Sequence, residues 1–150
     1  MSVPDESYVG RQLPPTEPYQ VGREKIREFA TAIGDDSAVC HDLAAARAAG
    51  HPDLVAPPTF SVSFTMPQIE AFLRDPDFGW DYSRMVHGDQ SITLHRPIHG
   101  GDELVTTIHV DDLRTRAGSH MLTLRCEVAD NAGEPVLTTK TLLVTQAASA

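Results

Sequence analysis

The segment 59–73 is apolar on nearly every side of the helix that its length predicts. A helix without a polar face is usually buried all round, so the rest of the chain has to enclose it. Pro57 and Pro58 suit the start of such a helix, because the first turn leaves its N–H groups unpaired. Pro67 predicts a kink or a split in the helix interior. The apolar side chains are Phe60, Val62, Phe64, Met66, Ile69, Phe72 and Leu73.

The chain after Gly79 changes to the period-two pattern of β-strands. Four segments alternate polar and apolar residues or run β-branched, and we expect the connectors IHGGD, RTRAGS and NAGE to form hairpin turns. Helices followed by consecutive antiparallel strands are typical of the α+β class. One antiparallel sheet wrapped around the central buried helix accounts for both patterns. The segments are SITLHRP, ELVTTIHVDDL, SHMLTLRCEVAD and PVLTTKTLLVTQ.

The chain before the apolar segment predicts an extended lead-in and two helices. Residues 1–18 contain four prolines, which favour extended backbone, and a short strand is expected near residues 19–21. A helix is predicted in GREKIREFATAIG, which has apolar residues at helical spacing and ends at a glycine, and a second in the Ala-rich DLAAARAAGH. Neither a repeat nor a second domain is indicated, so we expect residues 1–150 to form a single domain.

The charge and the cysteine content exclude several classes of partner. The net charge is −9 and no cluster of Lys and Arg stands out, which argues against nucleic acid or an anionic membrane as partner. Only a local basic patch, such as Arg23, Lys25 and Arg27, would suit an acidic carrier protein. Two cysteines, with neither a signal peptide nor a membrane span, indicate a soluble cytoplasmic protein. The spacing of His and Cys predicts no metal site.

The segment 34–42, GDDSAVCHD, packs three carboxylates, a thiol and an imidazole into nine residues. Asp35 and His41 are candidates for acid–base chemistry, which needs groups that exchange protons with the reacting atoms. Structural roles are also open to these residues. Asp35 can accept from loop amides just past a helix end, Asp42 suits the N-cap of the next helix, and Cys40 suits a small buried side chain.

Two stretches carry a wider resemblance, REKIREFATAIGDDSAVCHDLAAARAAGHPDLVAPPTF and LHRPIHGGDEL. They resemble the MaoC-like dehydratases over residues 8–144, and are most similar to the A and C subunits of heterodimeric (3R)-hydroxyacyl-ACP dehydratases. The resemblance implies a hot-dog fold, in which an antiparallel sheet wraps around a central helix. It also implies an activity in fatty-acid or polyketide assembly. The activity removes water from a (3R)-hydroxyacyl thioester of ACP or CoA, or adds water in the reverse direction. This chemistry needs no cofactor.

Catalytic members of that family carry a Gly-Asp-x-Asn-Pro-x-His pattern, and a backbone N–H at the start of the helix stabilises the thioester oxyanion. Here Asp35 matches the pattern, but Cys40 occupies the position of the histidine and His41 comes one residue late. Pro58 occupies the position of the oxyanion glycine and has no N–H to donate, although Thr59 can offer its own. The resemblance therefore implies Asp35 and His41 as catalytic residues of a degenerate motif.

The resemblance also implies a set of substrate-binding residues, at the start of the central helix and of the next strand. The phenylalanines among them serve equally as core, and the stretch VHGDQ suits a structural turn as well as a thioester or pantetheine contact. The GGD of IHGGD is expected to be a hairpin turn, because strands flank it on both sides. The implied substrate-binding residues are Pro58, Thr59, Phe60, Phe64, His87 and Gln90.

Several functions follow from this pattern. In the first, the chain shapes an acyl channel while a partner hot-dog chain, paired through the sheet edge, supplies the Asp/His pair of a heterodimer. In the second, a homodimer binds an acyl thioester without converting it. In the third, the chain is a self-sufficient dehydratase that uses Asp35 and His41; a thioesterase would depend on Asp35 as well. The first is favoured, because the resemblance is closest to subunits that lack the pair.

Overall fold

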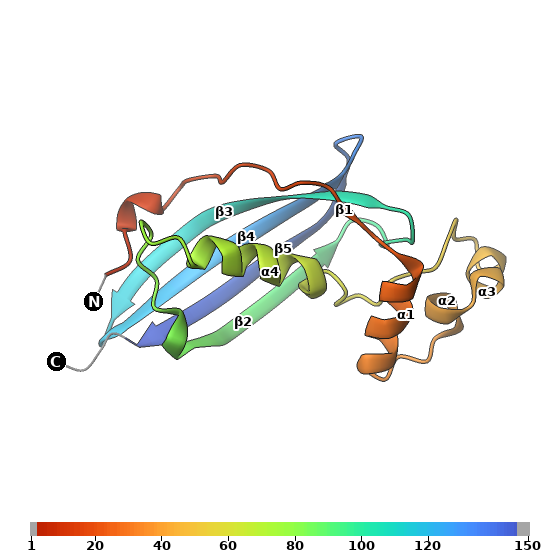
Figure 1. Ribbon diagram of the computed structural model, residues 1–150, viewed down its shortest axis with the longest axis horizontal. Coiled ribbons are helices and arrows are strands. Elements are labelled where there is room, and N and C mark those ends of the chain that lie inside the picture. The colour runs from red at the N-terminus through yellow and green to blue at the C-terminus, as the bar shows by residue number, and fades with distance from the viewer. Residues whose placement is uncertain (1–2, 147–150) are drawn as a thin grey trace.

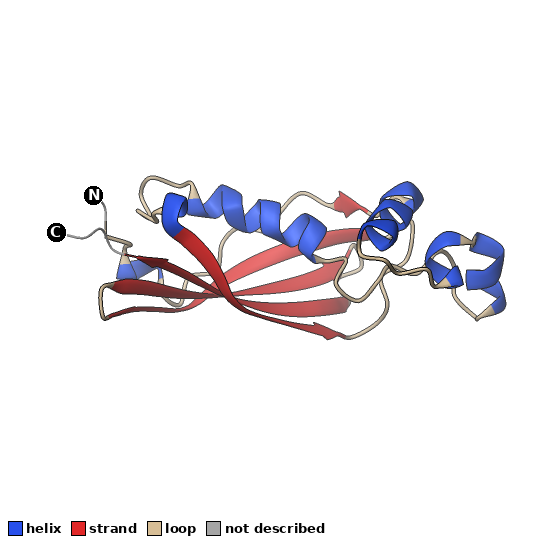
Figure 2. Ribbon diagram, turned by 90° about the horizontal axis from the view of Figure 1, so that it is seen from below, coloured by secondary structure: helices blue, strands red, loops and turns tan. Residues whose placement is uncertain are grey.

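A five-stranded antiparallel sheet curls around one long helix, α4, and three shorter helices lie beyond one end of it (Figures 1 and 2). The computed structural model describes residues 3–146. The strand order across the sheet is β1-β3-β4-β5-β2. This arrangement confirms the predicted α+β class, with a sheet wrapped around a helix. The helices are α1 (Arg23–Ala32), α2 (Ala38–His41), α3 (Leu43–Ala48) and α4 (Val62–Leu73), and the strands are β1 (Tyr19–Gln20), β2 (Met85–Leu94), β3 (Glu103–Arg116), β4 (Ser119–Asp130) and β5 (Pro135–Gln146).

The connector IHGGD is not a hairpin turn, so that prediction was wrong. β2 pairs with β5 at one side of the sheet, whereas β3 pairs with β1 and β4 at the other. Residues 95–102 therefore carry the chain across the end of the sheet. RTRAGS and NAGE do close hairpins, between β3 and β4 and between β4 and β5. In RTRAGS, Ala117 and Gly118 both have positive φ, 50° and 76°, as in the tight turns that match the twist of paired strands.

Asp102 holds the corner formed by residues 95–102. Arg96 donates to both of its carboxylate oxygens, at 2.8 and 3.2 Å, and the backbone N–H of His99 donates to Oδ2 at 2.8 Å. Gly100 is required because a Cβ there would lie 2.3 Å from Oδ1 of Asp53. The arginine, glycine and aspartate of LHRPIHGGDEL thus have a structural role, which is to build the corner between β2 and β3.

Gly100→Ala is expected to lower the free energy of unfolding by about 1–3 kcal/mol, the usual cost of forcing a group into a packed site. The added Cβ has to displace Asp53, which is bound to Arg23 at 2.7 Å and to the N–H of Leu54 at 2.8 Å. Urea unfolding followed by circular dichroism measures the change. Gly22→Ser is the control, since no heavy atom lies within 4 Å of a Cβ there and serine is favoured at the N-cap of α1, which this glycine occupies. Equal losses in both variants would contradict the expected clash.

The two helices predicted before the apolar segment form, but the polar stretch between them is not only a loop. α1 buries Ile26 and Ala30 on one face. Asp42 caps α3 as predicted, because its Oδ1 accepts from the N–H of Ala44 at 2.9 Å. Residues 38–41 form one turn of helix, α2, which was not predicted. Four residues are too few to display a helical period in the sequence.

Helix α4 contains Pro67 and still runs without a break, so the predicted split does not occur. Phe64 and Ile69, on either side of the proline, are buried, and their packing holds both halves of the helix on the sheet. The helix is also not enclosed all round. Pro67 and Ala71 are exposed, because the sheet of this one chain covers a single face of α4.

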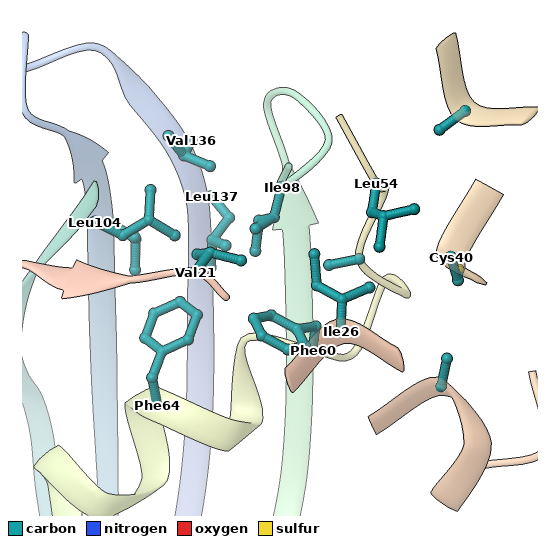
Figure 3. Close-up of a cluster of buried hydrophobic side chains, with 14 residues drawn as sticks. Val21, Ile26, Cys40, Leu54, Phe60, Phe64, Ile98, Leu104, Val136 and Leu137 are labelled. Atoms are coloured by element: carbon teal, nitrogen blue, oxygen red, sulfur yellow. The ribbon is translucent and has the colours of Figure 1, made fainter. Parts of the chain in front are cut away.

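The core has two parts, with polar side chains between them. The first gathers around the start of α4, where Phe60 and Phe64 pack with residues of α1 and of the sheet (Figure 3). The second lies along the rest of the helix. Thr106 on β3, and Thr139 and Thr141 on β5, stand between the apolar residues of the two parts and are at most 1% exposed. The interior under α4 is therefore not uniformly apolar.

The two edges of the sheet differ. The N-terminal lead-in covers the edge beside β3, where the N–H groups of Leu13 and Thr16 donate to carbonyls of that strand at 2.9 and 3.0 Å. On the outer side of β2, the described chain provides no neighbouring strand. Val86 and Leu94 on β2 are 62% and 39% exposed. An open edge with apolar side chains is suited to pairing with another chain.

Candidate functional site

Asp35 and His41 lie together, but not as an interacting carboxylate and imidazole. Nε2 of His41 is 2.8 Å from the backbone oxygen of Asp35, so this nitrogen acts as the donor. The Asp35 carboxylate accepts from the N–H of Ser37 at 3.0 Å and from Sγ of Cys40 at 3.9 Å. Arg27 donates to the backbone oxygen of His41 at 2.9 Å. These contacts fold the segment back against the end of α1.

The electrostatics of this segment favour a structural role for Cys40. Hydrogen bonds from Ser37 hold the pKa of Asp35 below its usual value, so the carboxylate stays ionised and accepts. Burial raises the pKa of the Cys40 thiol, and the charge of Asp35 raises it further. The thiol is 3% exposed. A protonated, buried thiol at the position of the motif's histidine has no basic electron pair to offer at neutral pH.

The basic residues of α1 are paired with carboxylates. Arg23 lies 2.7 Å from Asp53, Lys25 lies 3.9 Å from Glu28, and Arg27 pairs with Glu24. The local basic patch that an acidic carrier protein would need is therefore largely neutralised within the chain itself.

A pocket of about 450 Å³ lies between the start of α4 and the β2 side of the sheet. It brings together three of the six residues that the sequence implied for substrate binding: Pro58, Thr59 and Gln90. Ile92 and Leu94, which follow Gln90 on the same face of β2, complete the lining. The alternating pattern of SITL is the signal in the sequence for these two residues, which were not among the implied substrate-binding residues.

Thr59 offers a free backbone N–H beside this pocket. The neighbouring Phe60 N–H donates to the carbonyl of Pro57 at 2.9 Å, and Pro58 has no N–H. Among residues 3–146, the Thr59 N–H donates to no backbone acceptor. Thr59 lies in the turn 58–61 that leads directly into α4, two residues before the N-cap Ser61, and N–H groups just ahead of a helix lie near the positive end of its dipole. The Ser61 hydroxyl, fully buried, also lacks a partner in the described chain.

Phe60 and Phe64 do not line this pocket. They are 0% and 3% exposed and belong to the first part of the core. Phe29 meets the Phe60 ring edge-on at 5.5 Å between centroids, and Tyr19 stacks on Phe64 at 4.8 Å. Both phenylalanines support the start of α4 from within.

His87 and Gln90 lie in β2 and not in a turn, so the predicted turn at VHGDQ was wrong. The pairing of β2 with β5 shifts between His87 and Asp89, which makes Gly88 the extra residue of a β-bulge. A Cβ at Gly88 would meet Val144 and Leu142 at 3.3–3.4 Å. The bulge leaves the two side chains close enough for Nε2 of His87 to lie 2.9 Å from Oε1 of Gln90.

Two further observations concern metal binding and membrane-spanning helices. Over residues 3–146, no three His, Cys, Asp or Glu side chains are grouped so that they could hold a metal ion. The described helices include none that is long and apolar enough to span a membrane.

Comparison with known proteins places the chain in a family. A family model described as "FAS1-like, dehydratase domain region" matches residues 7–139. The chain belongs to the FAS1-like dehydratase domain family. A UPF0336 protein of Saccharopolyspora erythraea is 54% identical to this FAS1-like chain over 140 residues, which cover 93% of the chain and 90% of that relative. A UPF0336 protein of Thermobifida fusca is 43% identical over 140 residues, 93% and 92% of the two chains.

Solved structures agree with this assignment. A protein described as a MaoC-like dehydratase superposes on the FAS1-like chain with a TM-score of 0.86 and 34% identity, over 95% of this chain and 43% of that longer one. A chain of the HadBC (3R-hydroxyacyl-ACP dehydratase) complex of Mycobacterium tuberculosis superposes with a TM-score of 0.84 and 29% identity, over 91% of this chain and 96% of that one. These likenesses confirm the hot-dog fold and the relation to MaoC-like dehydratases.

Proposed function

We propose that this chain is a subunit of a (3R)-hydroxyacyl-thioester dehydratase, or enoyl hydratase, in fatty-acid or polyketide assembly. The chain forms one wall of the acyl site, and a partner hot-dog chain supplies the Asp/His pair. The substrate is an acyl thioester of a carrier protein or of CoA. The reaction requires no metal or organic cofactor.

The pocket at the start of α4 is the observation that carries this proposal. In dehydration, a base takes the proton from Cα while the hydroxyl leaves Cβ with a second proton as water. Negative charge collects on the thioester oxygen as the Cα proton leaves. A free N–H just ahead of a helix is suited to that oxygen, and Thr59 offers one beside a pocket with apolar walls.

The state of Asp35 and His41 supports a partner as the source of the acid–base pair. The His41 ring donates to a backbone oxygen, and the Asp35 carboxylate binds Ser37. With these contacts, the two side chains are not placed to bind one water molecule between them. The open edge of β2, next to the pocket, supports pairing with a second hot-dog chain through that edge.

A hydratase assay on a short trans-2-enoyl thioester tests the proposal by following the loss of conjugated absorbance. The assay is run with this chain, with a hot-dog partner that has an intact Gly-Asp-x-Asn-Pro-x-His motif, and with their mixture. We expect no turnover from this chain alone. In the mixture, we expect a higher kcat/KM than for the partner alone, or a changed preference for acyl length.

Two outcomes would replace the proposal. Turnover by this chain alone, stopped by His41→Ala or Asp35→Asn, would identify a self-sufficient dehydratase. Thioester binding by a homodimer, with neither turnover nor any effect on the partner, would identify a binding protein.

A further inference from the structure

Gln90 has an unusual set of contacts for a side chain that lines a pocket. Its Oε1 lies 2.9 Å from Oγ1 of Thr141 and 2.9 Å from Nε2 of His87. An amide oxygen only accepts hydrogen bonds, so the threonine hydroxyl and the histidine ring are both donors here. Thr141 is 1% exposed and belongs to β5, the strand that pairs with β2.

These two donors fix the orientation of the Gln90 amide. With Oε1 occupied from two sides, the amide nitrogen has to point elsewhere, and its two N–H groups have no acceptor among residues 3–146. Gln90 lines the pocket at the start of α4. The side chain therefore offers hydrogen-bond donors to whatever occupies this pocket.

The other lining groups restrict the chemistry of the occupant. Thr59 contributes its free N–H and its hydroxyl, while Pro58, Ile92 and Leu94 contribute apolar surface. None of these lining residues carries a charge. The pocket thus suits a neutral molecule with an apolar body and at least two oxygen acceptors, and it lacks the cations that a phosphate or a carboxylate would need.

We propose that Gln90 is a specificity-determining residue, whose Nε2 donates to a carbonyl oxygen of the acyl thioester while the Thr59 N–H binds a second one. Thr141 and His87 act through Gln90 as positioning residues, because they hold its amide oxygen away from the substrate. This inference rests on the proposed function, since it takes an acyl thioester as the ligand. Because the Thr59 N–H is assigned to the thioester oxygen, the carbonyl that Gln90 binds is that of the adjoining pantetheine amide.

The test is a titration of the ¹⁵N-labelled chain of residues 1–150, alone and with its partner, with three neutral probes. S-butyryl-N-acetylcysteamine has both carbonyls, S-ethyl thiobutyrate has only that of the thioester, and S-butyl-N-acetylcysteamine has only that of the amide.

We expect the Gln90 side-chain N–H signals to shift with the first probe. Gln90→Met should weaken its binding about fivefold to tenfold, as loss of one hydrogen bond predicts. One of the two probes with a single carbonyl should bind the Gln90→Met variant as tightly as it binds the wild type. That probe lacks the carbonyl that Gln90 binds.

Control variants separate recognition from stability. Thr141→Val releases the amide, so it should weaken binding and move the Gln90 side-chain signals, whereas Thr141→Ser keeps a hydroxyl and should restore both. Ser91→Ala, at an exposed neighbour of Gln90, should change nothing.

The outcomes distinguish this inference from the proposed function. If the probes shift the signals of Thr59 and Ile92 but Gln90→Met binds all three as the wild type does, the inference is wrong and the thioester site stands. If no probe shifts any signal of the pocket, with or without the partner, the proposed ligand is wrong and the inference falls with it.

Discussion

Phe60→Ala is expected to lower the free energy of unfolding by about 3–5 kcal/mol, as large-to-small changes at buried aromatic residues do. Phe60 is fully buried and packs between Phe29 and Phe64, with centroids 5.5 and 6.2 Å away. Domains of this size are stable by only about 5–15 kcal/mol, so the variant should lose between about a fifth and all of its stability. Urea unfolding followed by circular dichroism gives the value.

Two controls make this result informative about the site. Phe60→Leu retains most of the side-chain volume and should lower the free energy of unfolding by about 1 kcal/mol. Ile33→Ala changes a side chain that is 52% exposed, so it should change that free energy by less than about 0.5 kcal/mol. If Phe60→Ala cost no more than Ile33→Ala, the ring would not be packed. Phe60 would then line an open acyl channel, which was the other role that the sequence left open for it.

The strands after residue 100 were predictable because fully buried side chains alternate along them with side chains that are only partly buried or exposed. The predicted segments 103–113, 119–130 and 135–146 match β3, β4 and β5 closely. β2 begins at Met85, six residues before the predicted start. The bulge at Gly88 explains this error, since one extra residue reverses which positions of the strand face the core and so interrupts the alternation of polar and apolar residues. The order of the strands was not predictable in this way, because pairing of β2 with β5 joins segments about fifty residues apart in the chain.

The candidate site was predictable in part from the resemblance. It implied Pro58, Thr59 and Gln90, which the structure brings together in one pocket, and also Phe60 and Phe64, which belong to the core. The direction of the His41 ring was not predictable, since it depends on the unexpected helical turn α2. That turn is specified by four residues, and the side chains of Cys40 and His41 within it contact Asp35, in the connection that follows α1.

His41→Ala is expected to leave kcat of the assembled complex within about threefold of the wild type. Replacing the histidine in the partner's Gly-Asp-x-Asn-Pro-x-His motif should lower it by about 10²–10⁴, the range for loss of a general acid or base. The reason lies in the contacts of this chain, where the His41 ring donates to the backbone oxygen of Asp35. Steady-state kinetics on a trans-2-enoyl thioester measures both variants.

A structural effect of the same substitution has a different signature. Loss of the bond between His41 and Asp35 frees the turn α2 from the end of α1, which should lower Tm by a few degrees without changing the pH dependence of kcat. Asp35→Asn provides a second test, because it keeps the backbone oxygen that His41 binds and removes only the charge. If either variant removed the acid–base limbs of the pH profile, the pair in this chain would be the catalytic one. The shift of the histidine by one residue in GDDSAVCHD would then be a displaced active site, and the partner would complete the pocket without supplying the chemistry.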